Sequence, residues 1–214
     1  MNYFYFGLDL GQTHDYSALA VVEFAEPVVD RFDYISYLRT QRKLDPTFSV
    51  RHLQRFPLGT SYPDVVRATR ELTRRPEVRK KCTLVVDGTG VGKPVVDLVH
   101  EADFECDVVP VSITPGLAAR RDKGWWYVPK RDLIGVMQVL LEQRRVRIAQ
   151  DLREVQRVIE EFMAIESKAG ESGVQFGAWR NGAHDDLALA VALACWRAKG
   201  CERKIGERGD GRLI

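Results

Sequence analysis

Near its amino end the sequence contains the run Tyr5-Phe6-Gly7-Leu8-Asp9-Leu10-Gly11. Aromatic and aliphatic residues dominate residues 3–10, and such a composition is typical of a β-strand. A turn-like sequence follows at residues 11–15, and strand-forming residues resume at residues 17–24. We therefore predict a β-hairpin with a long loop, whose first strand ends next to an acidic side chain.

The sheet that contains this hairpin is expected to combine two kinds of strand pairing. Residues 30–38 predict a third strand of an antiparallel meander, whereas residues 45–56 are ambiguous. Buried strands are then predicted at residues 82–86 and 106–113, and each lies between helical patterns. Because helices and strands alternate here, we expect parallel pairing in this half of the chain.

The remaining segments predict helices and one additional β element. Residues 130–141 and 151–165 have the periodicity of amphipathic helices, and a last helix is predicted at residues 185–197. Residues 170–182 are rich in glycine and alternate in polarity, which predicts a β-hairpin or a mobile flap. We assign residues 1–198 to one domain and expect the charged tail at residues 199–214 to be disordered.

Three acidic positions lie where a hydrophobic segment meets a turn or a helix start: Asp9, Asp87 and the pair Asp185-Asp186. An unpaired carboxylate at the edge of an apolar core costs several kcal/mol, so all three are more easily explained if they converge on a cation. Carboxylate oxygens are the ligands that hard divalent cations prefer. The sequence therefore predicts a carboxylate site for a divalent metal ion.

The acidic pair contains an ambiguity, because neighbouring residues on a helix point about 100° apart. We favour Asp186 as the ligand, since it precedes Leu189 and Ala190 by three and four residues and shares their face. Asp185 could then cap the helix or act through a water molecule. His184 could be an accessory metal ligand or a phosphate contact.

Composition limits the other possibilities. The chain of 214 residues has 32 Lys and Arg against 30 Asp and Glu, so its overall charge does not indicate a nucleic-acid partner. Its four cysteines lack the CxxC spacing of zinc sites. No signal sequence with a basic start and no apolar run of about 18 residues is evident, so we expect a cytoplasmic protein without a membrane partner.

Four blocks of sequence carry a resemblance to a known family. They are GLD at residues 7–9 with DYSA at 15–18, VVDGTGVG at 85–92, VPKRDL at 128–133, and GAHDDLALA at 182–190. With the predicted order of elements, they resemble the ribonuclease H-like superfamily, and within it the nuclease domain of phage large terminase subunits. The resemblance implies an α/β fold with a mixed five-stranded sheet flanked by helices and an additional β-hairpin or flap.

The resemblance also implies a function. The protein would be an endonuclease that cuts double-stranded DNA with two Mg²⁺ or Mn²⁺ ions. It would act during phage genome packaging, in the cytoplasm of an infected or prophage-carrying cell. Asp9 would bridge the two ions, Asp87 would bind one and Asp186 the other, with Asp185 and His184 as accessory groups. The expected partners are DNA, an ATPase motor, a small terminase subunit and a portal. The chain would then be either an excised nuclease domain or a protein without a motor.

Candidate DNA contacts cluster between the last predicted parallel strand and the helix at residues 130–141. They are Arg120, Arg121, Lys123, Lys130 and Arg131. Such side chains hold a nucleic acid through its phosphates. Trp125 and Trp126 could stack on sugar or base, but we favour a role in closing the core.

Several alternatives remain open at this point. The glycine-rich segment at residues 87–94 does not match a phosphate-binding P-loop, because Asp87 replaces its first glycine and Pro94 its final Ser or Thr. A Holliday junction resolvase would have a similar set of acids but act on branched DNA. Residues 7–13 also resemble the first phosphate loop of actin and sugar kinases, although no second such domain follows. A non-catalytic DNA-binding packaging module is the last alternative.

Overall fold

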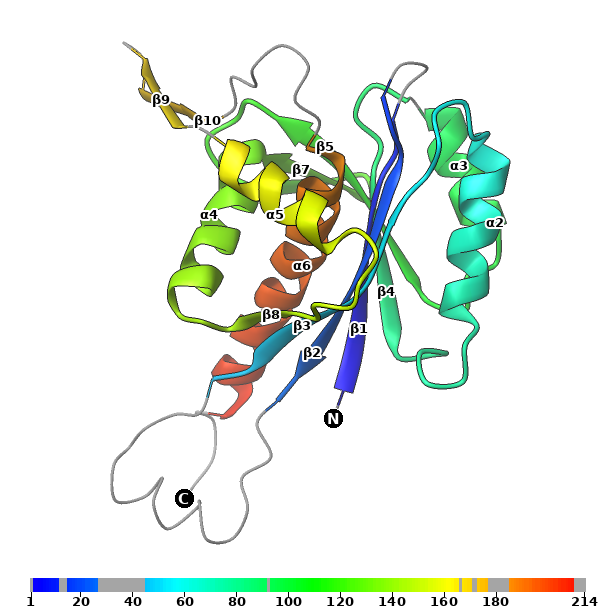
Figure 1. The fold of residues 1–214 in the computed structure, drawn as a ribbon, viewed down its shortest axis with the longest axis horizontal. Helices are drawn as coiled ribbons and strands as arrows, with labels where there is room; N and C mark the ends of the chain where they lie inside the picture. Colours follow the sequence, from blue (N-terminus) through cyan, green and yellow to red (C-terminus); the bar gives the residue numbers. More distant parts are fainter. Residues whose placement is uncertain are drawn as a thin grey trace, which may run out of the picture.

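The computed structural model describes residues 2–11, 15–26, 45–91, 93–165, 167–170, 173–176 and 185–209. Within these ranges, eight strands form one mixed sheet in the order β6-β7-β5-β4-β1-β2-β3-β8 (Figure 1). The strands are β1 (Asn2–Asp9), β2 (Ala18–Ala25), β3 (Thr47–Arg55), β4 (Cys82–Asp87), β5 (Asp107–Thr114), β6 (Arg120–Asp122), β7 (Trp125–Pro129) and β8 (Val146–Ile148).

The five central strands form the mixed sheet that the sequence predicts. β1, β2 and β3 are an antiparallel meander, and β4 and β5 add to β1 in parallel. The sheet is wider than predicted, because β7 and β6 extend one edge and β8 the other. β3 comes from the segment that the sequence left ambiguous, whereas the strand predicted at residues 30–38 lies outside the described residues.

Helices cover both faces of the sheet (Figure 1). α2 (Tyr62–Thr73) and α3 (Lys93–Glu101) lie on one face, while α4 (Lys130–Glu142), α5 (Val155–Ala164) and α6 (Asp186–Gly209) lie on the other. Ser61 caps α2, because its side chain accepts a hydrogen bond from the backbone N–H of Asp64. The three-layer arrangement, with helices on both faces of the sheet, is typical of α/β folds that contain parallel strand pairs.

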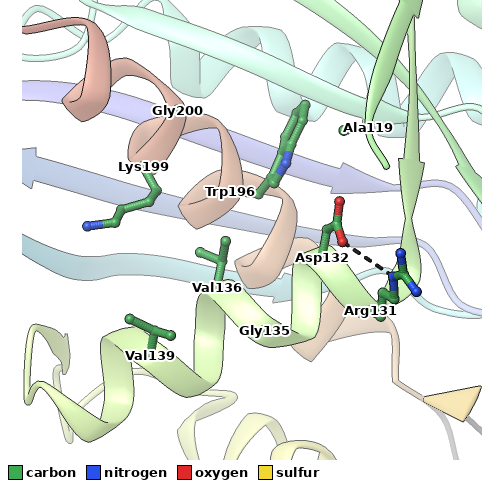
Figure 2. A pocket seen from close by; sticks show the side chains of 9 residues that line it. All are labelled: Ala119, Arg131, Asp132, Gly135, Val136, Val139, Trp196, Lys199 and Gly200. Atoms are coloured by element: carbon green, nitrogen blue, oxygen red, sulfur yellow. Dashed lines mark ion pairs between the residues drawn. The ribbon is translucent and has the colours of Figure 1, made fainter. Parts of the chain in front are cut away.

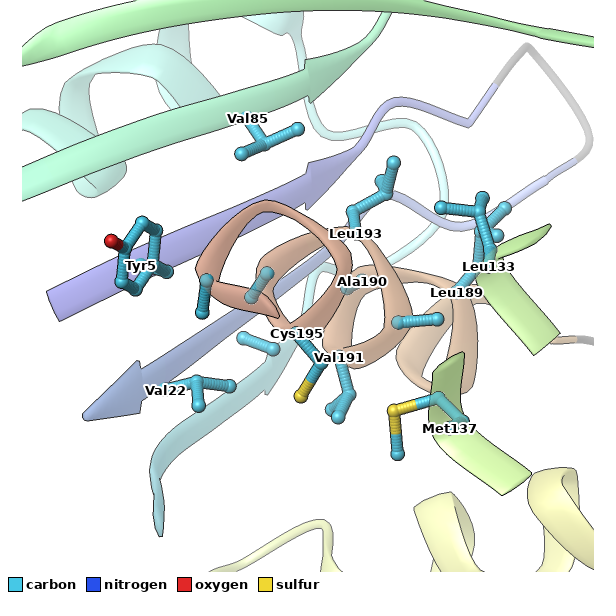
Figure 3. Packing of buried hydrophobic residues seen from close by; sticks show 14 of the residues in the cluster. Tyr5, Val22, Val85, Leu133, Met137, Leu189, Ala190, Val191, Leu193 and Cys195 are labelled. Atoms are coloured by element: carbon cyan, nitrogen blue, oxygen red, sulfur yellow. The ribbon is translucent and has the colours of Figure 1, made fainter. Parts of the chain in front are cut away.

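Alternation along β1 divides the core between the two faces. Phe6 and Leu8 are fully buried against the α2 and α3 side, whereas Tyr5 points to the side of α6. Figure 3 shows α6 packed against this second face, with Tyr5 and Val85 on the sheet side and Met137 on the α4 side. Since side chains alternate along a strand, Asp9 lies on the same face as Tyr5, toward α6.

Gly7 explains how closely α6 can approach the sheet. A Cβ atom at this position would lie 1.9 Å from the backbone oxygen of Ala190, so no other residue fits without moving the helix. Gly7 precedes Asp9 by two residues and therefore shares its face. The contact holds the amino-terminal part of α6 close to the end of β1.

The carboxyl-terminal part differs from the prediction. α6 continues to Gly209 rather than ending near residue 197. The expected disorder of the tail stays a prediction. β9 (Ser167–Gly170) and β10 (Gly173–Phe176) form an antiparallel hairpin, which begins before the segment predicted at residues 170–182. The domain boundary at residue 198 stays a prediction.

No helix among the described residues combines the length and the apolar character that crossing a bilayer requires. All four cysteines are free thiols.

Candidate metal centre

The register of the sheet places two of the predicted acidic residues side by side. Asp9 ends β1 and Asp87 ends β4, and these two residues are direct partners across the parallel pair. The same row continues through Ala18 to Arg55 in one direction and through Val111 in the other. Side chains in one row of a sheet point to the same face, so Asp9, Asp87 and Arg55 face the same side.

The start of α6 supplies the other two acids. Asp186 is the first residue of the helix, and the backbone carbonyl of Asp185 accepts the N–H of Leu189 at 2.8 Å. Asp185 therefore occupies the N-cap position by its backbone, which is one of the two roles predicted for it. Asp186 lies inside the helix and is 6% exposed.

All four carboxylates line a single open cavity of about 380 Å³. The residues around it are Asp9, Leu10, Gly11, Asp15, Asp87, Thr89, Ile113, Lys130, Asp185, Asp186 and Leu189. They come from the ends of β1, β4 and β5 and from the starts of α4 and α6. The structure thus brings together the acids that the sequence singled out, and adds Asp15, the last residue of the segment predicted as a turn.

Repulsion and burial make the free carboxylates unfavourable. Burial is the main cause that raises the pKa of Asp9 well above its usual value, and the negative charges of Asp87, Asp186 and Asp185 raise it further. Burial also raises the pKa of Asp87 to about 6, although Thr89 opposes the shift by donating its backbone N–H and its hydroxyl to Oδ1 at 2.8 and 2.5 Å. A bound cation would offset this cost in both residues.

Two cationic side chains already compensate part of the charge. Arg55 pairs with Asp186 at 2.8 Å, and Lys130 pairs with Asp185 at 2.7 Å. Lys130 also lowers the pKa of both Asp9 and Asp87. Lys130 had been predicted as a DNA contact, and the structure places it inside the acidic cavity.

The donor set fits a hard divalent cation, because it consists of carboxylates around an open, polar cavity. Within the described residues, however, no three His, Cys, Asp or Glu side chains are arranged to hold a metal ion as they stand. Asp185 and Asp186 are engaged by Lys130 and Arg55 instead. Assignment of Asp9, Asp87, Asp185 and Asp186 as metal ligands therefore stays a prediction, and His184 lies outside the described residues.

A second cavity, of about 470 Å³, lies between α4 and α6 (Figure 2). It contains one acidic side chain, Asp132, which pairs with Arg131 at 3.7 Å. Trp196, Val136 and Val139 form much of the remaining lining. This cavity has no carboxylate cluster and offers no comparable metal chemistry.

Three of the predicted DNA contacts, Arg120, Arg121 and Lys123, lie on the hairpin of β6 and β7. Arg120 and Arg121 are exposed on the edge strand β6, and the Arg120 guanidinium lies 4.1 Å from the centre of the Tyr127 ring. Lys123 is in the turn between the two strands. Arg131, in the first turn of α4, donates to the backbone carbonyl of Leu117. Their role in DNA binding stays a prediction.

The two neighbouring tryptophans pack inward. Trp126 lies against the core, and its ring meets that of Trp196 edge to face at 5.5 Å. A Cβ on Gly88 would lie 2.8 Å from the Trp125 ring, so the glycine makes room for this indole. The interpretation that both residues close the core is consistent with these contacts.

Sequence reasoning missed Arg55, Thr89 and Glu161. Arg55 ends a strand that could not be recognised as one, and Glu161 lies on α5 and accepts the backbone N–H of Ala188 at 2.8 Å. Thr89 belongs to a motif that was recognised, but its bond to Asp87 depends on the turn geometry. Only the spacing of Asp87 and Thr89 could have suggested a local side-chain bond.

No family model matches the chain, and no curated protein matches it significantly in sequence. Among solved structures, the large terminase nuclease from thermophilic phage G20c with bound magnesium has a TM-score of 0.59 at 21% identity, over 91% of this chain and 80% of that one. The nuclease domain of the large terminase subunit gp2 of bacterial virus Sf6 has a TM-score of 0.62 at 12% identity, over 90% of this chain and 87% of that one. The manganese-soaked human cytomegalovirus terminase nuclease domain has a TM-score of 0.53 at 13% identity, over 94% of this chain and 87% of that one.

The chain therefore has the fold of terminase nuclease domains. This confirms the predicted resemblance and the ribonuclease H-like α/β architecture, apart from the three additional strands. At these identities the likeness is one of fold, and the chemistry depends on the residues described above.

Proposed function

We propose that the protein is a metal-dependent endonuclease that cuts double-stranded DNA, as in phage genome packaging. The observation that carries this proposal is the convergence of Asp9, Asp87, Asp185 and Asp186 on one open cavity. These residues come from the first strand, the central strand and the last helix. A pure binding surface would gain nothing from clustered negative charge facing phosphate.

The carboxylates would hold two Mg²⁺ or Mn²⁺ ions. Asp9, beside Asp87 and near Asp186, is the residue suited to both ions, while Asp87 and Asp186 would each serve one. Bound cations would supply an activated water, a clamp on the phosphate and stabilisation of the leaving oxygen. Thr89 fixes the orientation of Asp87 through its two hydrogen bonds. Asp185 would act as an accessory group from the helix cap.

The protein also offers positive charge beside this cavity. Lys130 follows directly on β7, so the basic hairpin at residues 120–129 leads straight into the site. Arg120, Arg121, Lys123 and Arg131 are suited to hold the phosphates of a duplex near the cations. Phosphate contacts carry no base information, so we expect weak sequence preference.

The packaging setting rests on the fold shared with terminase nuclease domains. Within it, the partners would be an ATPase motor, a small terminase subunit and a portal, in the cytoplasm of a phage-infected or prophage-carrying cell. None of the quoted sequence blocks supplies a P-loop, so ATP hydrolysis would come from another chain or domain.

The test is incubation of the purified chain with supercoiled plasmid and Mn²⁺ or Mg²⁺, with EDTA as the metal-free arm. We expect nicked and linear DNA only with metal, and loss of cutting in Asp9→Asn and Asp186→Asn. Asp97→Asn, an exposed acid on α3, is the matched control and should cut normally. Cutting that persists in EDTA or in both site variants would contradict the proposal. Selective cutting of a four-way junction would favour a resolvase.

A further inference from the structure

Arg55 is held in a buried position by contacts on two sides. Its guanidinium pairs with Asp186 at 2.8 Å, and the two side chains are only 10% and 8% exposed. The same guanidinium lies 3.7 Å from the centre of the Tyr16 ring. A buried pair of this kind is costly to leave half-made, so Arg55 strongly affects where the Asp186 carboxylate points.

One atom of this pair and one atom of Glu161 are buried without a hydrogen bond. Among the described residues, Arg55 Nε and Glu161 Oε1 both lack a partner. The other carboxylate oxygen of Glu161 accepts the Ala188 N–H in the first turn of α6, which fixes this side chain next to the site. Glu161 is also close enough for Arg55 to lower its pKa and for Asp186 to raise it, although burial dominates and brings it to about 7. An unpaired donor and an unpaired acceptor therefore belong to two side chains that both bind the first turn of α6, at Asp186 and at Ala188.

A cation at the proposed site would compete directly with Arg55. Oδ2 of Asp186 accepts a hydrogen bond from the Arg55 guanidinium, so this oxygen can serve a metal ion only if the guanidinium releases it. Repulsion between the guanidinium and a divalent ion adds to this competition. After release, the positive charge of Arg55 needs another acceptor, and Glu161 Oε1 is the buried oxygen at hand.

We propose that Arg55 is a positioning residue that competes with the divalent cation for Asp186, and that Glu161 accepts Arg55 when the cation binds. This proposal rests on the proposed function, since it concerns the affinity of the same metal site. Arg55 holds Asp186 in place when metal is absent and limits the binding strength at that end of the cavity. Glu161 reduces this limit by giving the guanidinium a second partner.

The experiment is a titration of the full chain with Mn²⁺ at pH 7.5 in the absence of DNA. Binding is measured by calorimetry and by electron paramagnetic resonance of free Mn²⁺. Arg55→Gln should bind Mn²⁺ about tenfold more tightly than the wild type, because a competing charge is removed. Arg55→Lys keeps the charge, and its Mn²⁺ affinity should lie between those of the wild type and Arg55→Gln. Arg51→Gln is the matched control, because Arg51 lies on the same strand, is 56% exposed and pairs with Glu23.

The role of Glu161 is tested by a double-mutant cycle. Glu161→Gln should weaken Mn²⁺ binding several-fold in the wild-type background. The same substitution should have a smaller effect on Mn²⁺ affinity in the Arg55→Gln background. A manganese-soaked crystal of the wild type should show the Arg55 guanidinium bonded to Glu161 rather than to Asp186.

The outcomes separate the two proposals. If the wild type binds no Mn²⁺, the proposed function fails and the competition proposal falls with it. If the wild type binds Mn²⁺ but Arg55→Gln binds equally or more weakly, only the competition proposal is overturned. A soaked crystal in which Arg55 still holds Asp186 would overturn it as well, without any need for the variants to fold.

Discussion

Asp9 and Asp87 are direct neighbours on the parallel strands β1 and β4, and both carboxyl groups are buried. Neighbouring side chains of like charge in one row of a sheet destabilise the pairing. The pKa of each group is raised, mainly by burial, so folding makes both carboxyl groups harder to deprotonate. The metal-free protein therefore loses stability to keep these acids at its centre.

Asp87→Asn should stabilise the metal-free protein at pH 8. The folded pKa of Asp87 is about 6, above its unfolded value of about 3.9. The stability that the folded protein has with a protonated Asp87 is therefore fully present below pH about 4, and it is lost as the pH rises through 6. Asn keeps an oxygen for the Thr89 hydrogen bonds without the charge. We expect a gain of about 1 to 2 kcal/mol at pH 8 that vanishes near pH 4.

Thermal or urea unfolding in EDTA at several pH values measures this effect. Asp97→Asn, on the surface of α3, serves as the control and should leave the pH dependence unchanged. A variant of Asp87 that is less stable than the wild type at pH 8 would show that the charge is already compensated in the folded protein.

Gly7→Ala should be strongly destabilising. The new methyl group would meet the Ala190 carbonyl oxygen at 1.9 Å, and because this is backbone, α6 must move away from the sheet. We expect a loss of about 3 kcal/mol or more in the free energy of unfolding. Gly135→Ala in α4 has nothing within 4 Å of its new methyl group, and should gain about 0.5 to 1 kcal/mol. Equal stability of the two variants by urea unfolding would contradict the close approach.

The role of Gly7 illustrates what the sequence could and could not predict. The strand-forming residues of β1 and the apolar run in α6 predict these two elements, so the convergence of Asp9, Asp87 and Asp186 followed from topology. The distance between α6 and the sheet depends on one tertiary contact at Gly7, which has no local signature. The same reason explains why Arg55 was missed, because its partner lies 131 residues away.

The edges of the sheet were predicted less well than its centre. β6 and β8 are only three residues long, too short to show a repeating pattern. β3 has charged and polar residues at its outer positions, which weakened the signal for a strand. The extension of α6 to Gly209 passes through Gly200 and a highly charged segment, so local propensity argued for an earlier end.

Replacing both Arg120 and Arg121 by Ala should weaken binding of duplex DNA without changing metal affinity. Both side chains are exposed on β6, away from the four carboxylates. Loss of two phosphate contacts should reduce the slope of log affinity against log salt by about 2. Fluorescence anisotropy with a labelled duplex in Ca²⁺ at several salt concentrations measures the slope. Arg67→Ala, which is 69% exposed on α2 at the opposite face, is the control. An unchanged slope in the hairpin variant would remove β6 from the DNA path.

Lys130→Gln should shift the pH dependence of cutting toward higher pH. Lys130 lowers the pKa of Asp9 and of Asp87, so its removal makes both carboxyl groups harder to deprotonate. Protons then compete with metal up to a higher pH, and we expect the acidic limb of the rate profile to move up by about half a unit or more. Plasmid cutting from pH 5.5 to 9 at fixed Mn²⁺ measures this limb. Lys123→Gln, in the turn of the β6–β7 hairpin, should weaken DNA binding but leave the pH midpoint of the acidic limb unchanged. The same midpoint in both variants would show that Lys130 acts on the DNA and not on the carboxylates.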